Sequence, residues 1–280
     1  MKDSILVHAM YTPLEDYYIC YFDILGYKDF LDKNPDEHKN FLMEVLMSDA
    51  SIESILRNTN TEIELKYRAY SDNFIIFFPK FSDSKYEALR LLSIIVRKIQ
   101  IKLLMEFSMI IRGGITCGEF FANDKILFGT GLIKAYDMEN SIAQYPRVVI
   151  DNEFFKDELQ ELEFKNFIKK DNDEQYYVNY FYDENALKLI KGKCEKLIDK
   201  HGKYDLRIKD PKRIYQQEKT INKHVWLLVK FNECCEEIGC ENLKMNYILK
   251  INSRLFKMEV SCYKMKMQNK PRLYQLLTLL

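Results

Sequence analysis

Residues 16–25, DYYICYFDIL, run directly into Gly26. Aromatic and β-branched side chains dominate this run, and such a run that ends at a glycine is typical of a buried strand followed by a turn. Asp23 stands near its end, between Phe22 and Ile24. A carboxylate in apolar company needs a cation or a hydrogen-bond donor. The run therefore predicts a buried strand that ends in a partnered carboxylate.

The segments that follow alternate between helical and strand patterns. Apolar residues recur at helical spacing in residues 36–57 and 83–107, whereas residues 63–79 and 109–121 have the composition of strands. Ser71-Asp72-Asn73 interrupts the first of these strand-like segments. Such a tripeptide favours a tight turn, so residues 63–79 are predicted to form a hairpin.

The order of elements predicts the fold class. A helix over 132–144, a short strand over 146–151 and a further helix from about residue 152 complete the series. Strand, helix, strand, strand, helix, strand is the ferredoxin-like βαββαβ order, an α+β fold with a central antiparallel sheet. Five of the nine glycines fall between positions 113 and 131, which indicates a place of close backbone approach.

The chain is long enough for one catalytic domain and an appendage. Residues 183–201 and 213–239 have helical patterns, so we expect a domain over residues 1–180 and a helical C-terminal extension over residues 181–280. The 42 basic and 42 acidic residues cancel, which gives no reason to expect a nucleic-acid partner. Without a signal peptide pattern or an apolar run of membrane length, the expectation is a soluble cytoplasmic protein with no membrane partner. Seven irregularly spaced cysteines indicate reduced thiols.

Two acidic residues are the candidates for chemistry. Asp23 ends the first predicted strand, and Asp72 lies at the turn of the predicted hairpin. The first strand of a ferredoxin-like sheet is central and the hairpin pairs beside it, so the two carboxylates can converge at one edge. Hard divalent cations would balance such a pair. For Asp72 alone the alternative of an ordinary turn residue stays open, since Ser-Asp-Asn is a common turn tripeptide.

A turn suited to phosphate adjoins the first carboxylate. Asp23 is followed by Ile24, Leu25, Gly26 and Tyr27, so a strand end, a glycine and a helix start lie in succession. The N–H groups at a helix start have no partner within the helix and favour anions. We therefore expect the backbone of Gly26 and Tyr27 to bind phosphate beside the metal site.

Four motifs resemble those of the class III nucleotide cyclases, and they occur in the same order. CYFDILGYKDFL resembles the first metal motif and YSDN the second, while IIRGGITCGEFF resembles the strand and turn that follow. ILFGTGLIKAYDMEN resembles the glycine-led helix that in this superfamily reaches across a dimer interface. The resemblance covers residues 16–151. With YPRVVI and KHVWLLVKFNE downstream, the set is most similar to the Pycsar pyrimidine cyclases of bacteria.

The resemblance implies a two-metal cyclase. Asp23, the Ile24 carbonyl and Asp72 would hold two Mn²⁺ or Mg²⁺ ions, and Asp23 and Asp72 would be catalytic through them. The implied substrate is UTP, with CTP as the alternative, and the products are the 3′,5′-cyclic monophosphate and pyrophosphate. The implied assembly is a homodimer with shared active sites, and a separate effector protein would read the product in antiphage defence.

Departures from the purine cyclases bear on the choice of base. Arg68 stands where purine cyclases have Lys or Glu on the hairpin, and Ile126 stands where they have Asp or Cys. A guanidinium offers donors to the carbonyls of uracil or cytosine, so Arg68 and Tyr70 are the candidate base contacts. The Asn and Arg that stabilise the transition state in adenylate cyclases align with Ile133 and Asp137.

Three candidates for the missing cation are therefore weighed: Arg112, Arg147 and a lysine near Lys169 and Lys170, of which Arg112 is preferred as catalytic. Two other classes of protein with a ferredoxin-like fold are alternatives to this cyclase family. A diguanylate cyclase would carry its signature at the hairpin, and YSDN is not that signature. A noncatalytic ferredoxin-like binding module stays as the alternative, although it would have no use for both carboxylates beside a phosphate turn.

Overall fold

The computed structural model describes residues 14–33, 65–80, 84–123, 125–201, 203–205, 208–245, 248–252 and 257–261. By its contacts the chain divides into two compact units. The first contains the residues up to Leu103 together with Met109–Tyr180. The second contains Leu104–Ser108 and the residues from Phe181 onward.

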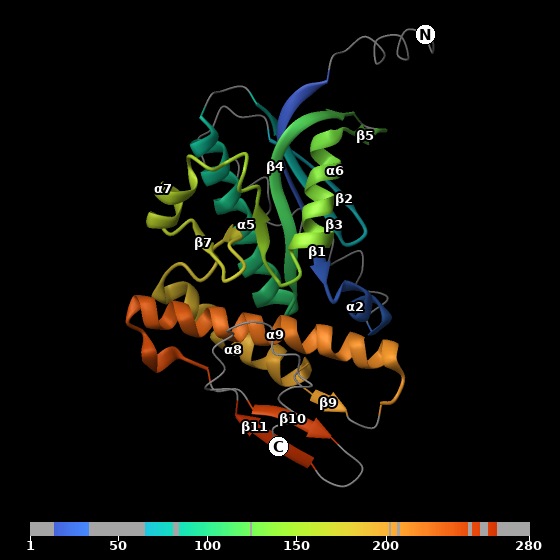
Figure 1. Cartoon of the computed structure of the whole chain (residues 1–280), viewed down its shortest axis with the longest axis vertical. Helices are drawn as coiled ribbons and strands as arrows, with labels where there is room; N and C mark the ends of the chain where they lie inside the picture. Colours follow the sequence, from blue (N-terminus) through green and yellow to red (C-terminus); the bar gives the residue numbers. More distant parts are fainter. Residues whose placement is uncertain are drawn as a thin grey trace. The chain divides into compact units, whose positions relative to one another are not determined.

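A mixed sheet forms the centre of the first unit (Figure 1). In the described ranges its order is β2-β3-β1-β4-β6-β8-β7, with β5 beside β4. The strands are β1 (Glu15–Leu25), β2 (Lys66–Tyr70), β3 (Asn73–Pro79), β4 (Ile110–Ala122), β5 (Leu127–Phe128), β6 (Val148–Ile150), β7 (Ile168–Lys170) and β8 (Tyr176–Val178). The order β2-β3-β1-β4 is that of a ferredoxin-like sheet, so the predicted α+β fold is confirmed.

The strand β1 is central and pairs along its length on both sides. It runs antiparallel to β3, where Asp23 lies opposite Asn73, and antiparallel to β4, where Asp23 lies opposite Arg112. Continuous burial of residues 18–22 explains the unbroken apolar run in the sequence, because helices or loops cover both faces of a central strand. The helix α2 (Tyr27–Lys33) begins directly after β1, and the predicted helix over 36–57 lies outside the described residues.

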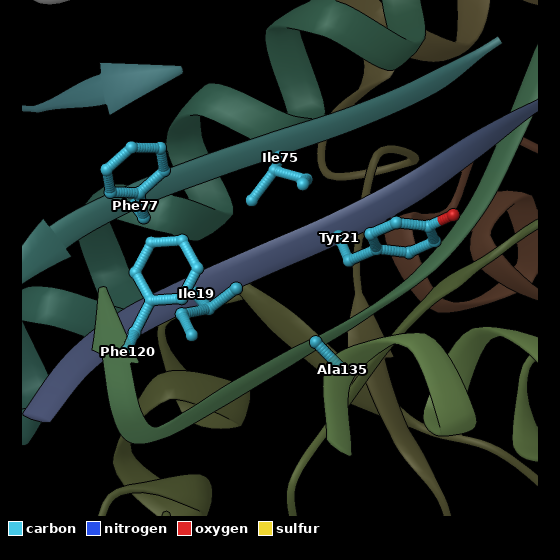
Figure 2. Packing of buried hydrophobic residues seen from close by; sticks show 6 residues of the cluster. All are labelled: Ile19, Tyr21, Ile75, Phe77, Phe120 and Ala135. Atoms are coloured by element: carbon cyan, nitrogen blue, oxygen red, sulfur yellow. The ribbon is translucent and has the colours of Figure 1, made fainter. Parts of the chain in front are cut away.

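One face of the sheet carries the helix α6 (Thr130–Asp137), which continues as a π-helical turn over Met138–Ile142. Figure 2 shows the apolar cluster beneath it, in which side chains of three neighbouring strands meet Ala135 of α6. Its buried members are Ile19, Tyr21, Ile75, Phe77, Phe120 and Ala135. The alternate residues of β1, such as Tyr18, point to the other face, where Tyr18 contacts Phe154 and Phe155. Lys85 of α5 (Lys85–Phe107) also contacts Phe154, which places α5 on that second face (Figure 1).

Glycines allow α6 to lie very close to β4. A Cβ at Gly118 would stand 2.9 Å from the Cα of Gly131, and a Cβ at Gly114 would stand 2.6 Å from the Cβ of Met138. Both separations are too short for real side chains, so strand and helix approach each other backbone to backbone. The glycines between 113 and 131 thus have the role that the sequence predicted for them.

The prediction that a helix begins at about residue 152 is wrong. Residues 152–158 form successive turns, and α7 spans only Leu159–Phe164. Phe154 and Phe155 both contact Tyr18, with ring centroids 6.3 and 6.2 Å away. A regular helix turns by about 100° per residue and would direct these neighbouring rings apart. Packing of both rings against Tyr18 therefore outweighs the helical pattern of the sequence.

The second unit contains the two predicted long helices, α8 (Glu184–His201) and α9 (Pro211–Ile238). Asp210 caps α9 by accepting from the Arg213 N–H, and Gly239 ends it at a φ of 78°. The unit also has a three-stranded sheet, which a purely helical extension does not contain. Its strands are β9 (Lys203–Asp205), β10 (Ile248–Asn252) and β11 (Lys257–Ser261). These strands are only three to five residues long, so their alternation is a weak sequence signal.

No helix in the described part of the chain is both long enough and apolar enough to cross a membrane. The six cysteines described as free are all buried. Burial raises the pKa of Cys235 to about 11, which keeps its thiol protonated.

The close approach of α6 to β4 gives a stability prediction. Gly118→Ala should lower the free energy of unfolding by about 1 to 3 kcal/mol, because the added methyl group meets the backbone of Gly131. Gly192→Ala, at an exposed site in α8 with open space around its Cβ, is the matched control and should raise it by about 0.5 to 1 kcal/mol. Denaturant titration measures both, and equal effects of the two substitutions would contradict the packing account.

Candidate active site

The two predicted carboxylates come together at one end of β1. Asp23 lies opposite Asn73 across the β1–β3 pair, and the Ile24 N–H donates to the Asp72 carbonyl over 2.9 Å. In the β2–β3 hairpin only Ser71 and Asp72 separate the paired residues Tyr70 and Asn73. Ser71 has a φ of 60°, a value that L residues rarely adopt. This tight turn holds Asp72 beside the end of the central strand.

Arg112 lies next to Asp23 on the neighbouring strand. Its Nε is 3.3 Å from Asp23 Oδ2, and the two side chains are 17% and 16% exposed. The predicted catalytic cation is therefore brought to the predicted metal carboxylate by strand register alone. A largely buried carboxylate and guanidinium attract each other more strongly than an exposed pair, and removal of either one leaves the other as an unpaired buried charge.

A third acidic residue, Glu139, joins this cluster and was not predicted. It is 3% exposed, and its Oε1 is 2.6 Å from the Arg112 Nη2. The sequence pattern predicts one regular helix over residues 132–144. Nothing in that pattern indicates that Glu139 would be buried. Glu139 belongs to the AYDMEN run, in which the regular helix ends at Asp137 and the π-helical turn begins at Met138.

Asp72 is oriented by a second set of side chains. The Asn73 Nδ2 donates to Asp72 Oδ1 over 3.2 Å, and the Tyr21 hydroxyl donates to Asn73 Oδ1 over 2.5 Å. Tyr21 is buried beneath Tyr136, with ring centroids 5.6 Å apart. The amide of Asn73 thus links the turn carboxylate to the sheet core.

The cluster carries an excess of negative charge in a largely buried setting. Burial raises the pKa of Asp23, as does the nearby charge of Asp72, while Arg112 opposes the shift. The pKa of Tyr21 is raised by burial and by the charges of Glu139, Asp23 and Asp72. Three carboxylates around one guanidinium leave a net charge of −2, which a divalent cation would neutralise.

The donors present fit a hard divalent metal. Asp23 and Asp72 supply carboxylate oxygens, and no three acidic, histidine or cysteine side chains of the described ranges form a fuller metal set. The Ile24 N–H points toward the Asp72 turn, so the Ile24 carbonyl points the same way, as in any β-strand. Two carboxylates and a carbonyl leave positions for water and for phosphate oxygens, which is the arrangement Mg²⁺ prefers.

The structure places the predicted substrate residues around this point. Gly26, at a φ of 89°, makes the turn after β1, and its carbonyl accepts from Phe30 N at the start of α2. Tyr27 follows with a buried side chain. Tyr70 pairs with Asn73 beside Asp23, and Arg68 pairs with Ile75 beside Tyr21. Paired strand residues share a face, so Arg68 and Tyr70 lie on the same face of the sheet as Asp23.

The other candidate cations have structural partners. The Arg147 guanidinium is fully buried and paired with Asp171 and Asp173, and Lys170 is paired with Glu174. Ile133 and Asp137 lie instead on an outer stripe of α6, along a surface hollow of about 400 Å³. Its lining residues are Thr130, Ile133, Lys134, Asp137, Met138, Ser141 and Ile142.

No family model and no curated protein matches the chain. Among solved structures, the chain is similar to the guanylyl cyclase Cya2, with 12% identity and a TM-score of 0.35, over 52% of this chain and 79% of that one. It is also similar to the catalytic core of a rhodopsin-guanylyl cyclase with converted specificity in complex with ATPαS, with 12% identity and a TM-score of 0.41, over 59% and 96%. Likenesses at this level assign neither an activity nor a substrate to the chain.

The cluster predicts an unusual effect of one substitution. Asp72→Asn should leave the free energy of unfolding in chelator equal to or above that of the parent, within about 1 kcal/mol, because it removes the repulsion on Asp23. Chemical denaturation in EDTA measures this.

Asp171→Asn is the matched comparison, because it weakens the partner of the buried Arg147 and should cost about 3 to 5 kcal/mol. A large loss of stability for Asp72→Asn would show instead that Asp72 is a structural turn residue.

Proposed function

We propose that this protein is a class III nucleotide cyclase that converts UTP to 3′,5′-cyclic UMP and pyrophosphate, with residues 1–180 as its catalytic domain. The observation that supports it most is the convergence of Asp23 and Asp72 beside the Ile24 backbone, at the end of the central strand. The ordered motifs over residues 16–151 support the choice of reaction, because the same two carboxylates fall in the two metal motifs.

Each group of residues in the site would have its own role in an in-line displacement. Two Mg²⁺ or Mn²⁺ ions, held by Asp23, Ile24 and Asp72, would lower the pKa of the substrate 3′-hydroxyl and neutralise the departing pyrophosphate. Gly26 and Tyr27 would bind phosphate through backbone N–H groups. Arg112, which lies beside Asp23, is assigned to the catalytic set as the cation that would stabilise the transition state. No protein nucleophile is needed.

Pyrimidine choice is assigned to the hairpin. Arg68 and Tyr70 share the face of Asp23, and Tyr70 is 53% exposed there, so its ring is available for contact with a base. The Arg68 Nη1 donates to the neighbouring Tyr67 carbonyl over 2.9 Å, and the several N–H donors of a guanidinium are the chemistry that a base carbonyl would bind. The O2 carbonyl is common to uracil and cytosine, so CTP is the alternative substrate.

We further propose that the active form is a homodimer with shared sites. Large apolar side chains are exposed together on α6 and β5, where Ile133 is 61% exposed and Tyr136 and Phe128 are about half exposed. The hollow along α6 adds concave apolar surface to this face. A second copy that covers this face would bring its own residues beside Asp137 and Met138, which continue into the turn that holds Glu139.

The decisive assay supplies each of ATP, GTP, CTP and UTP separately with Mn²⁺ and identifies the products by mass spectrometry. Cyclic UMP from UTP is expected, and Asp72→Ala should lower the rate by about 100-fold or more, because the metal contribution is lost. Cyclic CMP alone would change the substrate and keep the reaction. Full activity of Asp72→Ala would overturn the site assignment, and Arg68→Ala should selectively raise the KM for the pyrimidine substrate.

The dimer face has its own test by sedimentation velocity. Ile133→Asp should convert the dimer to a monomer and abolish cyclic product, because it places a charge in a buried apolar interface. Phe164→Asp is the matched control, since Phe164 is 90% exposed on α7, and it should change neither property. A fully active monomeric Ile133→Asp variant would contradict shared active sites.

A further inference from the structure

Glu139, Arg112 and Asp23 form a chain of ion pairs beside the metal carboxylates. The Arg112 Nη2 is 2.6 Å from Glu139 Oε1, and the Arg112 Nε is 3.3 Å from Asp23 Oδ2. The side chain of Glu139 is 4% exposed and that of Arg112 is 17% exposed. Arg112 thus donates a hydrogen bond to Asp23 and forms a shorter ion pair, without hydrogen-bond geometry, with the more deeply buried Glu139.

The backbone that presents Glu139 is specialised. Glu139 lies in the π-helical turn Met138–Ile142, where the Ala143 N–H donates to the Met138 carbonyl over 2.9 Å. Single π turns within helices are frequent at functional sites. Met138, the preceding residue, packs on Gly114 of β4, two positions after Arg112. The packing of the Met138 side chain against the backbone of Gly114 therefore holds the start of the π turn close to the strand that carries Arg112.

The geometry sets up a competition for one positive charge. Asp23 and Glu139 share the Arg112 guanidinium, so neither carboxylate is fully neutralised by it. If Glu139 were uncharged, Arg112 would be free to pair with Asp23 alone and would compete with a metal ion for that carboxylate. The net charge of the four groups would also fall from −2 to −1, which weakens attraction for a divalent cation.

We propose that Glu139 is a positioning residue of the metal site, which holds Arg112 so that Asp23 stays available to a divalent cation. This inference rests on the proposed two-metal function and assigns it a supporting residue outside the metal ligands. Partners that orient metal ligands are commonly as important to metal affinity as the ligands' own geometry.

The test measures Mn²⁺ binding to the full chain without nucleotide, by electron paramagnetic resonance of the free ion. Glu139→Gln keeps the size of the side chain and removes its charge, and it should weaken Mn²⁺ binding by about tenfold or more. Glu161→Gln, at an exposed glutamate of α7, is the matched control and should bind Mn²⁺ like the parent.

The double variant Arg112→Gln/Glu139→Gln separates positioning from mere structural support. It removes the competing cation together with the buried anion, so the charge returns to −2, and Mn²⁺ affinity should recover to within about threefold of the parent. If Glu139 were only a packing residue, the double variant would bind no better than the single one. That result, or unchanged binding in Glu139→Gln with an unaltered melting temperature, would overturn the inference.

The same titration distinguishes this failure from failure of the proposed function. Asp23→Asn and Asp72→Asn should each lose Mn²⁺ binding if the metal centre is assigned correctly. Parent-like binding by both would refute the metal centre itself. Loss of binding in these two variants with parent-like binding in Glu139→Gln would refute only the role of Glu139.

Discussion

The repulsion between Asp23 and Asp72 is the constraint around which the rest of the site is arranged. Burial raises the pKa of Asp23 and the nearby charge of Asp72 raises it further, so an ionised Asp23 costs stability unless a cation balances it. Neighbouring side chains on both sides of the pair reduce this cost. Arg112 balances Asp23 from one side, while Asn73 and Tyr21 orient Asp72 from the other. Under the proposed function, the remaining negative charge of this arrangement would attract a divalent ion.

The close seat of α6 on the sheet connects packing to this chemistry. Gly118 and Gly131 let the helix approach β4, and the contact of Met138 with Gly114 continues that approach to the level of Arg112. The π turn begins at this contact and directs Glu139 inward. A helix held farther from the sheet by ordinary side chains could not place a short buried ion pair there. The glycine-rich sequence between 113 and 131 therefore supports both the core and the electrostatics of the site.

Much of the fold and half of the site could be predicted from the sequence. The strand β1, the hairpin, α5 and β4 carry strong local patterns, and the two aspartates stand at the ends and turns of these elements. Glu139 could not be predicted, because its role depends on a break in helical periodicity that the packing of Met138 on Gly114 accompanies. The sequence leaves Arg147 as a candidate catalytic cation. In the structure its guanidinium is buried and paired with Asp171 and Asp173. Residues distant in sequence decide such cases, and local patterns do not record them.

The most direct test of a two-metal centre is a crystal structure with Mn²⁺ and a non-hydrolysable UTP analogue, in which anomalous scattering locates the ions. We predict two anomalous peaks beside Asp23, the Ile24 carbonyl and Asp72, with the phosphates of the analogue next to them. Absence of ions at these carboxylates in a nucleotide-bound crystal, or nucleotide bound elsewhere on the chain, would contradict it.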